Sequence, residues 1–393
     1  MTKMETTVRA THASPQQKTL PAGWRWVRLL DIVDRITPGK LFDRESCKPE
    51  GKVPVVDQSE CGFMGFHNEA PGVIASEDLP LVTFANHTCA VRLHTAPFSV
   101  IQNVFPLQAR EGIDPFFVYW VLCGRLPATF YGGHWPMLVK KELPLPPLPE
   151  QRRIAGVLKE QMAAVEKARA AAQARIEAVK ALPAAFLRQA FPQPGQPLPD
   201  GWRWVKLGEV CEQDRRIVEP NTVEADWLTY YSLEHIESET GRILKAPIEQ
   251  VEDVGKSTTF RFDECHVLYG KLRPYLNKVA LPDAPGRCTT EMIPLICSNE
   301  IDRVFLAWVL RRGETVQFAM QGKTGSRMPR ADMDSLPTLE IPLPPLSEQR
   351  RIAGVLKEQV AAVEKARAAA EAELETINAL PAALLRRAFN GEI

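Results

Sequence analysis

Apolar positions recur every seven residues in two long segments of the chain, and both segments are rich in residues that favour helices. The spacing forms a seam of small and aliphatic side chains with charged side chains outside it, which is typical of paired helices. The seam consists of Leu158, Val165, Ala172 and Val179 in the first segment and of Leu356, Val363, Ala370 and Ile377 in the second. The pattern predicts two long helices that pack through one apolar face.

The two helical segments are nearly identical copies. Residues 151–172 and 349–370 differ only at Met162, which is replaced by Val360. Each copy follows a proline-rich lead-in whose prolines fix extended backbone. Pro183 and Pro381 are expected to break or kink the helices after roughly 30 residues. A repeat of this length predicts a chain of two equivalent halves. A hairpin that only tethers domains is the weaker alternative, because a tether would tolerate sequence drift.

The segment before each helical copy predicts a globular domain. The two domains open alike, with LPAGWRWVRLLDIV at 20–33 and LPDGWRWVKLGEVC at 198–211, and then diverge. Short β-like runs lie at 53–56, 81–84, 90–93, 228–232, 266–269, 278–281 and 292–296, and helical runs lie at 115–130 and 302–321. Each half is therefore expected to be an α/β or α+β domain.

The expected organisation is domain, helix, domain, helix. We divide the chain into a disordered N-terminal tail (1–19), a first globular domain (20–148), a first helical spacer (149–197), a second globular domain (198–346) and a second helical spacer (347–393). The helices are held fixed while the domains have diverged. This contrast favours helices that dock one kind of partner twice and domains that recognise two different targets.

Composition restricts the remaining possibilities. The formal net charge is zero, so nucleic-acid binding has to rest on local clusters of cations. The eight cysteines include no C-x-x-C pair, which predicts reduced thiols in a cytoplasmic protein and no metal site. The tail lacks the apolar core of a signal peptide, and no apolar run is long enough to cross a membrane.

Motifs for catalysis are missing from the sequence. It contains no G-x-G-x-x-G, G-x-S-x-G or H-E-x-x-H motif, and no Asn-Pro-Pro-aromatic tetrad of an adenine methyltransferase. Gly322-Lys323-Thr324 matches the end of a P-loop, but the glycine required five positions earlier is Gln317. We therefore expect no catalytic residue and no cofactor of the chain's own.

Two cationic stretches of the second half are suited to binding a polyanion. Lysine and arginine neutralise phosphates, arginine can donate two hydrogen bonds to guanine, and tyrosine can pack on a sugar or a base. The two stretches contribute Lys271, Arg273, Tyr275 and Lys278, followed by Lys323, Thr324, Ser326, Arg327 and Arg330. Weaker counterparts in the first half are Asn86, His87, Arg92, His134, Trp135 and Lys140. Each cluster could instead be a solvated surface.

The chain resembles the specificity (S) subunits of type I restriction-modification enzymes. The resemblance covers the chain after the first 19 residues and is carried by the L-P-x-G-W-x-x-V-x-L openings and the exits PLPPLPEQRRIA and PLPPLSEQRRIA. It implies two target recognition domains, each reading one half of a bipartite site in double-stranded DNA, and helices that form an antiparallel coiled coil with pseudo-twofold symmetry. It further implies two bound methyltransferase (modification) subunits and, in complexes that cleave DNA, restriction subunits.

In such a complex the chain is non-catalytic, and S-adenosylmethionine and ATP belong to the partner subunits. The resemblance implies that Lys271, Arg273, Tyr275 and the loop 322–330 lie on the DNA face. The helices would dock the partners, through Arg152, Arg153, Leu158, Val165, Arg350, Arg351, Leu356 and Val363. The alternative is a protein-interaction adaptor with oligomerising helices and no DNA binding. Steep loss of DNA affinity with salt separates the two readings.

Overall fold

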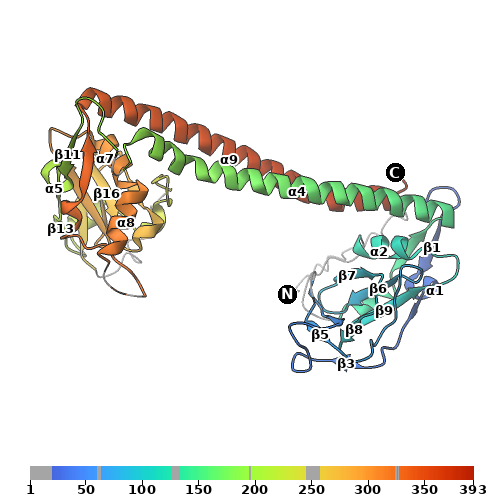
Figure 1. Ribbon diagram of the computed structural model, residues 1–393. Coiled ribbons are helices and arrows are strands. Elements are labelled where there is room, and N and C mark those ends of the chain that lie inside the picture. The colour runs from blue at the N-terminus through green and yellow to red at the C-terminus, as the bar shows by residue number, and fades with distance from the viewer. Residues whose placement is uncertain are drawn as a thin grey trace, which may run out of the picture. The chain divides into compact units, whose positions relative to one another are not determined.

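The computed structural model describes residues 20–59, 63–124, 133–193, 196–244, 257–323, 325 and 327–393. The chain divides into two compact units, Met1–Ala171 with Leu374–Ile393, and Ala172–Glu373. Each unit contains one β-rich domain and a part of each of the two long helices, α4 (Leu148–Ala190) and α9 (Leu346–Phe389) (Figure 1). The predicted tail lies outside the described residues.

The first domain opens and closes on one antiparallel pair, β1 (Arg25–Arg28) with β10 (Glu142–Leu145). Its first sheet is antiparallel throughout, in the order β2 (Val33–Arg35), β9 (Val104–Ala109), β6 (Leu81–Ala85) and β7 (Val91–His94). The second sheet has the order β3 (Leu41–Phe42), β8 (Ser99–Ile101), β4 (Val53–Val56) and β5 (Gly65–His67), with β8 parallel to β3 and β4. Its short helices are α1 (Leu29–Ile32), α2 (Pro115–Cys123) and α3 (Trp135–Leu138).

The second domain repeats the opening pair and the first sheet of this plan. The pair β11 (Arg203–Lys206) with β20 (Glu340–Leu343) corresponds to β1 with β10. The sheet β12 (Cys211–Gln213), β19 (Met292–Cys297), β16 (His266–Gly270) and β17 (Val279–Ala280) has the same order and directions as its counterpart. The other sheet is β13 (Ile217–Val218), β15 (Thr259–Phe262), β18 (Gly286–Thr289) and β14 (Thr229–Tyr231). The α-helices are α5 (Leu207–Val210), α6 (Val223–Trp227), α7 (Arg303–Leu310) and α8 (Gly313–Gln321), and the 3-10 turns are η1 (Leu233–His235), η2 (Pro274–Leu276) and η3 (Leu336–Thr338).

These mainly antiparallel sheets confirm the α+β class. The internal repeat extends from the helices to the opening strand pair and the first sheet of each domain, whereas the second sheets differ in strand order and direction. The single helix expected over 302–321 is wrong. It is divided into α7 and α8 because the backbone of Arg312 is extended, and its guanidinium donates to the Pro192 carbonyl at 3.2 Å. Arg311 is likewise buried and donates to the Val279 carbonyl at 2.6 Å. The region 125–132, included in the other predicted helix, lies outside the described residues.

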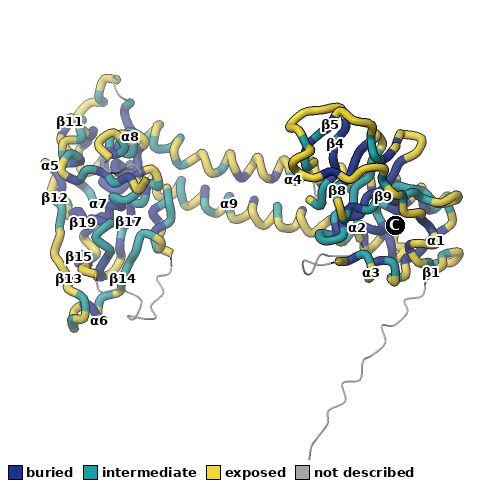
Figure 2. The backbone as a smooth tube through the Cα atoms, turned by 90° about the horizontal axis from the view of Figure 1, so that it is seen from below, coloured by how far each residue is buried: buried dark blue, intermediate teal, exposed yellow. Residues whose placement is uncertain are grey.

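The two long helices confirm the predicted seam at seven of its eight positions, and Val179 is half-buried. Leu158, Val165, Ala172, Leu356, Val363, Ala370 and Ile377 are all buried, whereas most intervening positions are exposed (Figure 2). The expected break at the prolines is wrong, because both helices continue through Pro183 and Pro381. Within the first unit Arg169 contacts Asn378 and Arg153 contacts Ile393, so the helices run antiparallel there.

A buried glutamine explains the proline-rich exit of each domain, which ends in Glu-Gln. Gln151 accepts from the Asp114 backbone N–H at 2.9 Å and donates to the Pro146 carbonyl at 2.9 Å. Gln349 makes the same two bonds, to Asp302 and Pro344, at 2.7 and 2.8 Å. Each glutamine thereby joins the end of a domain, the start of a long helix and the aspartate that caps α2 or α7. Sequence inspection identified this motif without its role.

Candidate nucleic-acid interface

The structure brings the two cationic stretches of the second domain together. The loop after β16 and the loop after α8 form an antiparallel bridge between Leu272 and Arg330. On either side of it, Ala331 N–H donates to the Lys271 carbonyl at 2.8 Å, and Arg273 N–H donates to the Pro329 carbonyl at 2.7 Å. Residues 56 to 60 positions apart in sequence therefore form one continuous surface.

Four cations and one aromatic side chain of this surface are available to a ligand. Arg273, Tyr275, Lys323 and Arg327 are exposed, and Lys271 is half-buried. In the part of the chain that the structure describes, none of these cations forms a side-chain hydrogen bond or ion pair. We call these five residues the basic loop surface. Arg273 sits at φ 52°, a left-handed conformation that is uncommon for a non-glycine residue and often marks functional loops.

Two predicted cations are used within the protein instead. The Lys278 ammonium donates to the Leu233 carbonyl at 2.6 Å, and burial lowers the pKa of Lys278. The Arg330 guanidinium forms a two-pronged ion pair with Glu291 at 2.8–3.0 Å. Both side chains therefore support the loops. Thr324 and Ser326 lie outside the described residues.

The first domain holds the corresponding loops by the same backbone contacts. His134 N–H donates to the Asn86 carbonyl, and Asn86 N–H donates to the Asn103 carbonyl, both at 2.9 Å. In the second domain the matching bonds are Ala331 to Lys271 and Lys271 to Glu291. The two domains thus present the same pair of loops, as the sequence comparison of the halves predicted.

The side chains on the first-domain loops differ in their availability. His134 is buried, and Trp135 packs edge-on against Phe105, with ring centroids 4.9 Å apart. The Asn86 side chain accepts from the Trp135 backbone N–H at 2.8 Å. Arg92 is paired with Asp57 at 3.2 Å, and its side chain is 13% exposed.

Of the other first-domain predictions, His87 is half-buried, and its backbone N–H donates to the Gln58 side chain at 3.0 Å. Lys140 is exposed and has no side-chain partner among the described residues. The described loops of the first domain are therefore held mainly by internal contacts.

The predicted partner-binding residues of the helices fall into two groups. Leu158, Val165, Leu356 and Val363 are buried within their units. The four arginines, Arg152, Arg153, Arg350 and Arg351, are exposed. Arg153 pairs with Glu150 and Arg351 with Glu348 in the same i,i+3 geometry. The aliphatic residues therefore build the helix pair, while the arginines remain on its surface.

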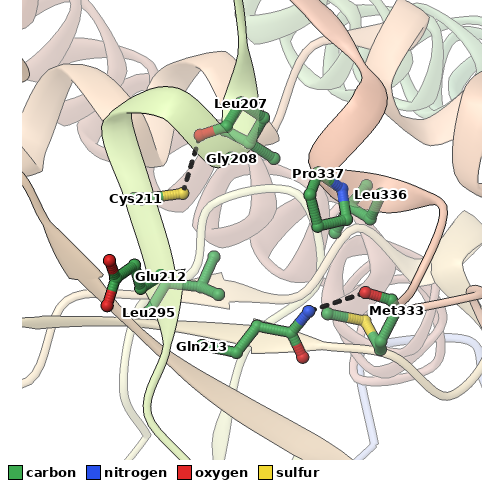
Figure 3. A pocket seen from close by; sticks show the side chains of 9 residues that line it. All are labelled: Leu207, Gly208, Cys211, Glu212, Gln213, Leu295, Met333, Leu336 and Pro337. Atoms are coloured by element: carbon green, nitrogen blue, oxygen red, sulfur yellow. Dashed lines mark hydrogen bonds between the residues drawn. The ribbon is translucent and has the colours of Figure 1, made fainter.

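A small apolar pocket of about 250 Å³ lies between α5, β12 and η3 of the second domain (Figure 3). Two of its polar side chains are already paired: Gln213 donates to the Met333 carbonyl at 2.6 Å, and the Cys211 thiol to the Leu207 carbonyl at 3.4 Å. Burial raises the pKa of Cys211 to about 12, so this thiol stays protonated at neutral pH. The pocket offers no activated nucleophile among its lining residues.

Comparison with known proteins places this fold in one class. Residues 199–375 match the family model described as "Type I restriction modification DNA specificity domain". The type I restriction enzyme EcoDI specificity subunit of Escherichia coli is 24% identical, over 95% of this chain and 89% of its own length.

Two solved structures have the same fold. One, from a study of "complex assembly" and "conformational transition of the type I R-M system", has a TM-score of 0.72, is 22% identical, and is matched over 95% of this chain and 100% of its own. The HsdS subunit from Thermoanaerobacter tengcongensis has a TM-score of 0.58, is 22% identical, and is matched over 96% and 99%.

The chain is therefore similar, over nearly its whole length, to specificity subunits of type I restriction-modification systems, the family that its openings and exits resemble. Among the described residues, every helix is too short or too polar to traverse a bilayer.

Proposed function

We propose that this chain is the sequence-specific DNA-binding subunit that directs a type I restriction-modification complex to a bipartite target in double-stranded DNA. The chain carries no catalytic residues in this proposal, and methyl transfer and ATP-dependent steps belong to its partner subunits. Similarity to type I specificity subunits supports this function, and the basic loop surface is the observation that carries it.

The chemistry of the basic loop surface suits DNA. Lysine and arginine side chains that lack protein partners can neutralise phosphates without breaking existing ion pairs. An exposed arginine can also contact O6 and N7 of guanine in the major groove, at about 1–3 kcal/mol of discrimination. Tyr275, whose residue surface is 49% exposed, offers a ring that can pack on sugar or base. In this proposal the second domain reads one half-site and the first domain reads the other.

The long helices are proposed to dock two methyltransferase subunits. Within 151–172 and 349–370 their exposed positions are as strictly repeated as their buried ones, although helix packing alone constrains only the buried positions. Arg152 and Arg350 are examples of equivalent exposed residues in the two copies. The same partner surface on two copies of one subunit explains why these positions have not diverged.

Methylation mapping in the host tests this function. The native gene is replaced by wild type, Lys271→Ala/Arg273→Ala or the control Lys206→Ala, which removes an exposed lysine of β11 outside the basic loop surface. We expect a methyltransferase to co-purify with all three proteins. Adenine methylation at one split motif should persist with wild type and Lys206→Ala and fall or broaden in sequence with the double variant. An unchanged methylome after deletion of the gene would contradict the proposal.

A further inference from the structure

Three side chains with different donor atoms converge in the turn between β15 and β16. They are Asp263, Cys265 and His266, whose potential ligand atoms lie within 4.8 Å of one another. Cys265 Sγ is 3.6 Å from His266 Nδ1, and Asp263 Oδ1 is 2.7 Å from each of these atoms. A tetrahedral zinc ion separates a sulfur ligand from a nitrogen ligand by about 3.6 Å. The sulfur–nitrogen pair therefore already has the spacing of two zinc ligands.

The buried histidine is oriented as a metal ligand would be. His266 is fully buried, and its Nε2 contacts Asp214 Oδ2 at 2.9 Å. A carboxylate on the far nitrogen fixes the ring and leaves the near nitrogen as the ligand atom, as in many zinc sites. Nδ1 also accepts the Asp263 backbone N–H at 3.1 Å, a bond that a metal ion at Nδ1 would have to replace. Two acceptor atoms 2.7 Å apart, Nδ1 and Asp263 Oδ1, repel unless a proton or a cation lies between them.

One arginine stands beside the cluster but leaves its ligand atom accessible. Arg216 contacts Asp263 through Oδ2 at 3.4 Å and Asp214 through Oδ2 at 2.8 Å. Asp263 Oδ1, the oxygen that faces sulfur and nitrogen, is not the atom that Arg216 holds. Asp263 is half-buried and Cys265 is exposed. The aspartate can therefore move outward by the roughly 0.7 Å that zinc–ligand geometry requires, and water can complete the tetrahedron.

The first domain shows that the fold does not need polar groups at this place. The backbone bond from Asp214 to the Pro294 carbonyl recurs from Ile36 to the Pro106 carbonyl, each at 2.9 Å. The pairing of β16 with β19 likewise matches that of β6 with β9, which makes Leu81 the equivalent of His266.

Leu81 and Ile36 pack in one apolar cluster where the second domain has a histidine and an aspartate. A buried ionic pair is seldom more stabilising than an apolar pair of similar volume. The presence of Asp214 and His266 at these positions of the second domain therefore indicates a ligand.

We propose that Asp263, Cys265 and His266 bind one divalent transition-metal ion, with zinc as the preferred metal and Asp214 orienting His266. The donor set of one thiolate, one imidazole and one carboxylate matches zinc in type and number for a site with one open position. The site lies where the chain passes between the two sheets, since both the β12–β13 and the β15–β16 connections cross from one sheet to the other. The ion joins these two crossings and stabilises the second domain. This role is independent of the proposed DNA binding.

Zinc titration of the untagged, metal-stripped full-length chain tests the site. The variants are Cys265→Ser, Asp214→Asn and Asp214→Ile/His266→Leu, the last of which introduces the apolar pair of the first domain. Cys47→Ser, a half-buried cysteine of the first domain, is the control. We expect wild type and Cys47→Ser to bind about one zinc per chain by calorimetry and elemental analysis. Asp214→Asn should bind roughly 10–100-fold more weakly, and the other two variants should lose the ion.

Thermal unfolding gives a second readout. Zinc should raise the melting temperature of wild type and of Cys47→Ser and leave that of Cys265→Ser unchanged, because an ion that binds only the folded state stabilises it by mass action. Failure of wild type to bind zinc, or equal binding by Cys265→Ser, would overturn the proposal. Because Cys265 is exposed, its replacement by serine is expected to leave folding intact even if the double variant does not fold.

Discussion

The loop that follows β6 in the first domain and the loop that follows β16 in the second are held by the same two backbone hydrogen bonds, yet they carry different side chains. In the second domain Lys271 and Arg273 have no side-chain partners among the described residues. In the first, Asn86 bonds the backbone of Trp135, and Arg92 bonds Asp57. Backbone contacts thus preserve the loop pair while its side chains change.

The difference extends below the surface. His266 and Asp214 in one domain replace Leu81 and Ile36 in the other. The positions that do not differ are those that join a domain to its helix, above all the buried glutamines at the helix starts. Comparing the two halves therefore distinguishes the residues that hold each domain on its helix from the residues that are free to vary with the target.

The largest expected effect comes from these glutamines. Gln349 donates to the Glu300 carbonyl at 2.9 Å in addition to the two bonds that it shares with Gln151. A buried polar group that loses its partner costs about 1–3 kcal/mol. Gln349→Ala should therefore lower the free energy of unfolding by about 4 kcal/mol, and Gln151→Ala by about 3 kcal/mol.

Denaturant unfolding of the full chain measures both values. Gln173→Ala, at an exposed position of α4, is the control and should change stability by less than about 0.5 kcal/mol. Equal, near-zero effects at all three positions would show that the glutamines do not anchor the helices.

Lowering the pH should destabilise the first domain more than the second, because the first contains His94. Burial, with a smaller effect of the Arg92 charge, lowers the pKa of His94 to about 4. Between pH 6.5 and 4 the unfolded chain binds a proton that the folded chain does not, so stability falls as pH falls, by roughly 3 kcal/mol in all. In the second domain the pKa of Glu237 is lowered, because hydrogen bonds from Thr240 and Arg242 outweigh burial. That carboxylate loses its contribution only below the usual glutamate pKa.

Hydrogen exchange at pH 7 and pH 5 checks this prediction. Protection of β6 and β7 should decrease at pH 5 in wild type and much less in His94→Gln, which cannot titrate. Identical pH dependence in the two proteins would assign the acid sensitivity of the first domain to other groups.

Periodicity and repetition predicted the long helices, the buried seam and most core strands, because these depend on local pattern. Tertiary contacts decided the rest. The split between α7 and α8 depends on two arginines whose burial cannot be read from their neighbours in sequence. Lys278 and Arg330 were predicted as ligand contacts, but each finds a partner from a distant segment, Leu233 or Glu291.

The cluster at the β15–β16 turn was also missed. Its signal was the adjacency of Asp263, Cys265 and His266, but Asp214, which fixes the histidine, is 52 residues away.

The central claim is that the basic loop surface of the second domain contacts DNA. The most direct measurement is the salt dependence of DNA affinity for the complex with its methyltransferase subunits, comparing wild type with Arg273→Ala and Lys206→Ala. If Arg273 contacts a phosphate, the slope of log K against log salt should fall by about 1 for Arg273→Ala alone. If it contacts a base, the slope should stay and the affinity for the target should fall by about 1–3 kcal/mol with relaxed specificity. Identical affinity, slope and specificity in all three proteins would contradict the claim.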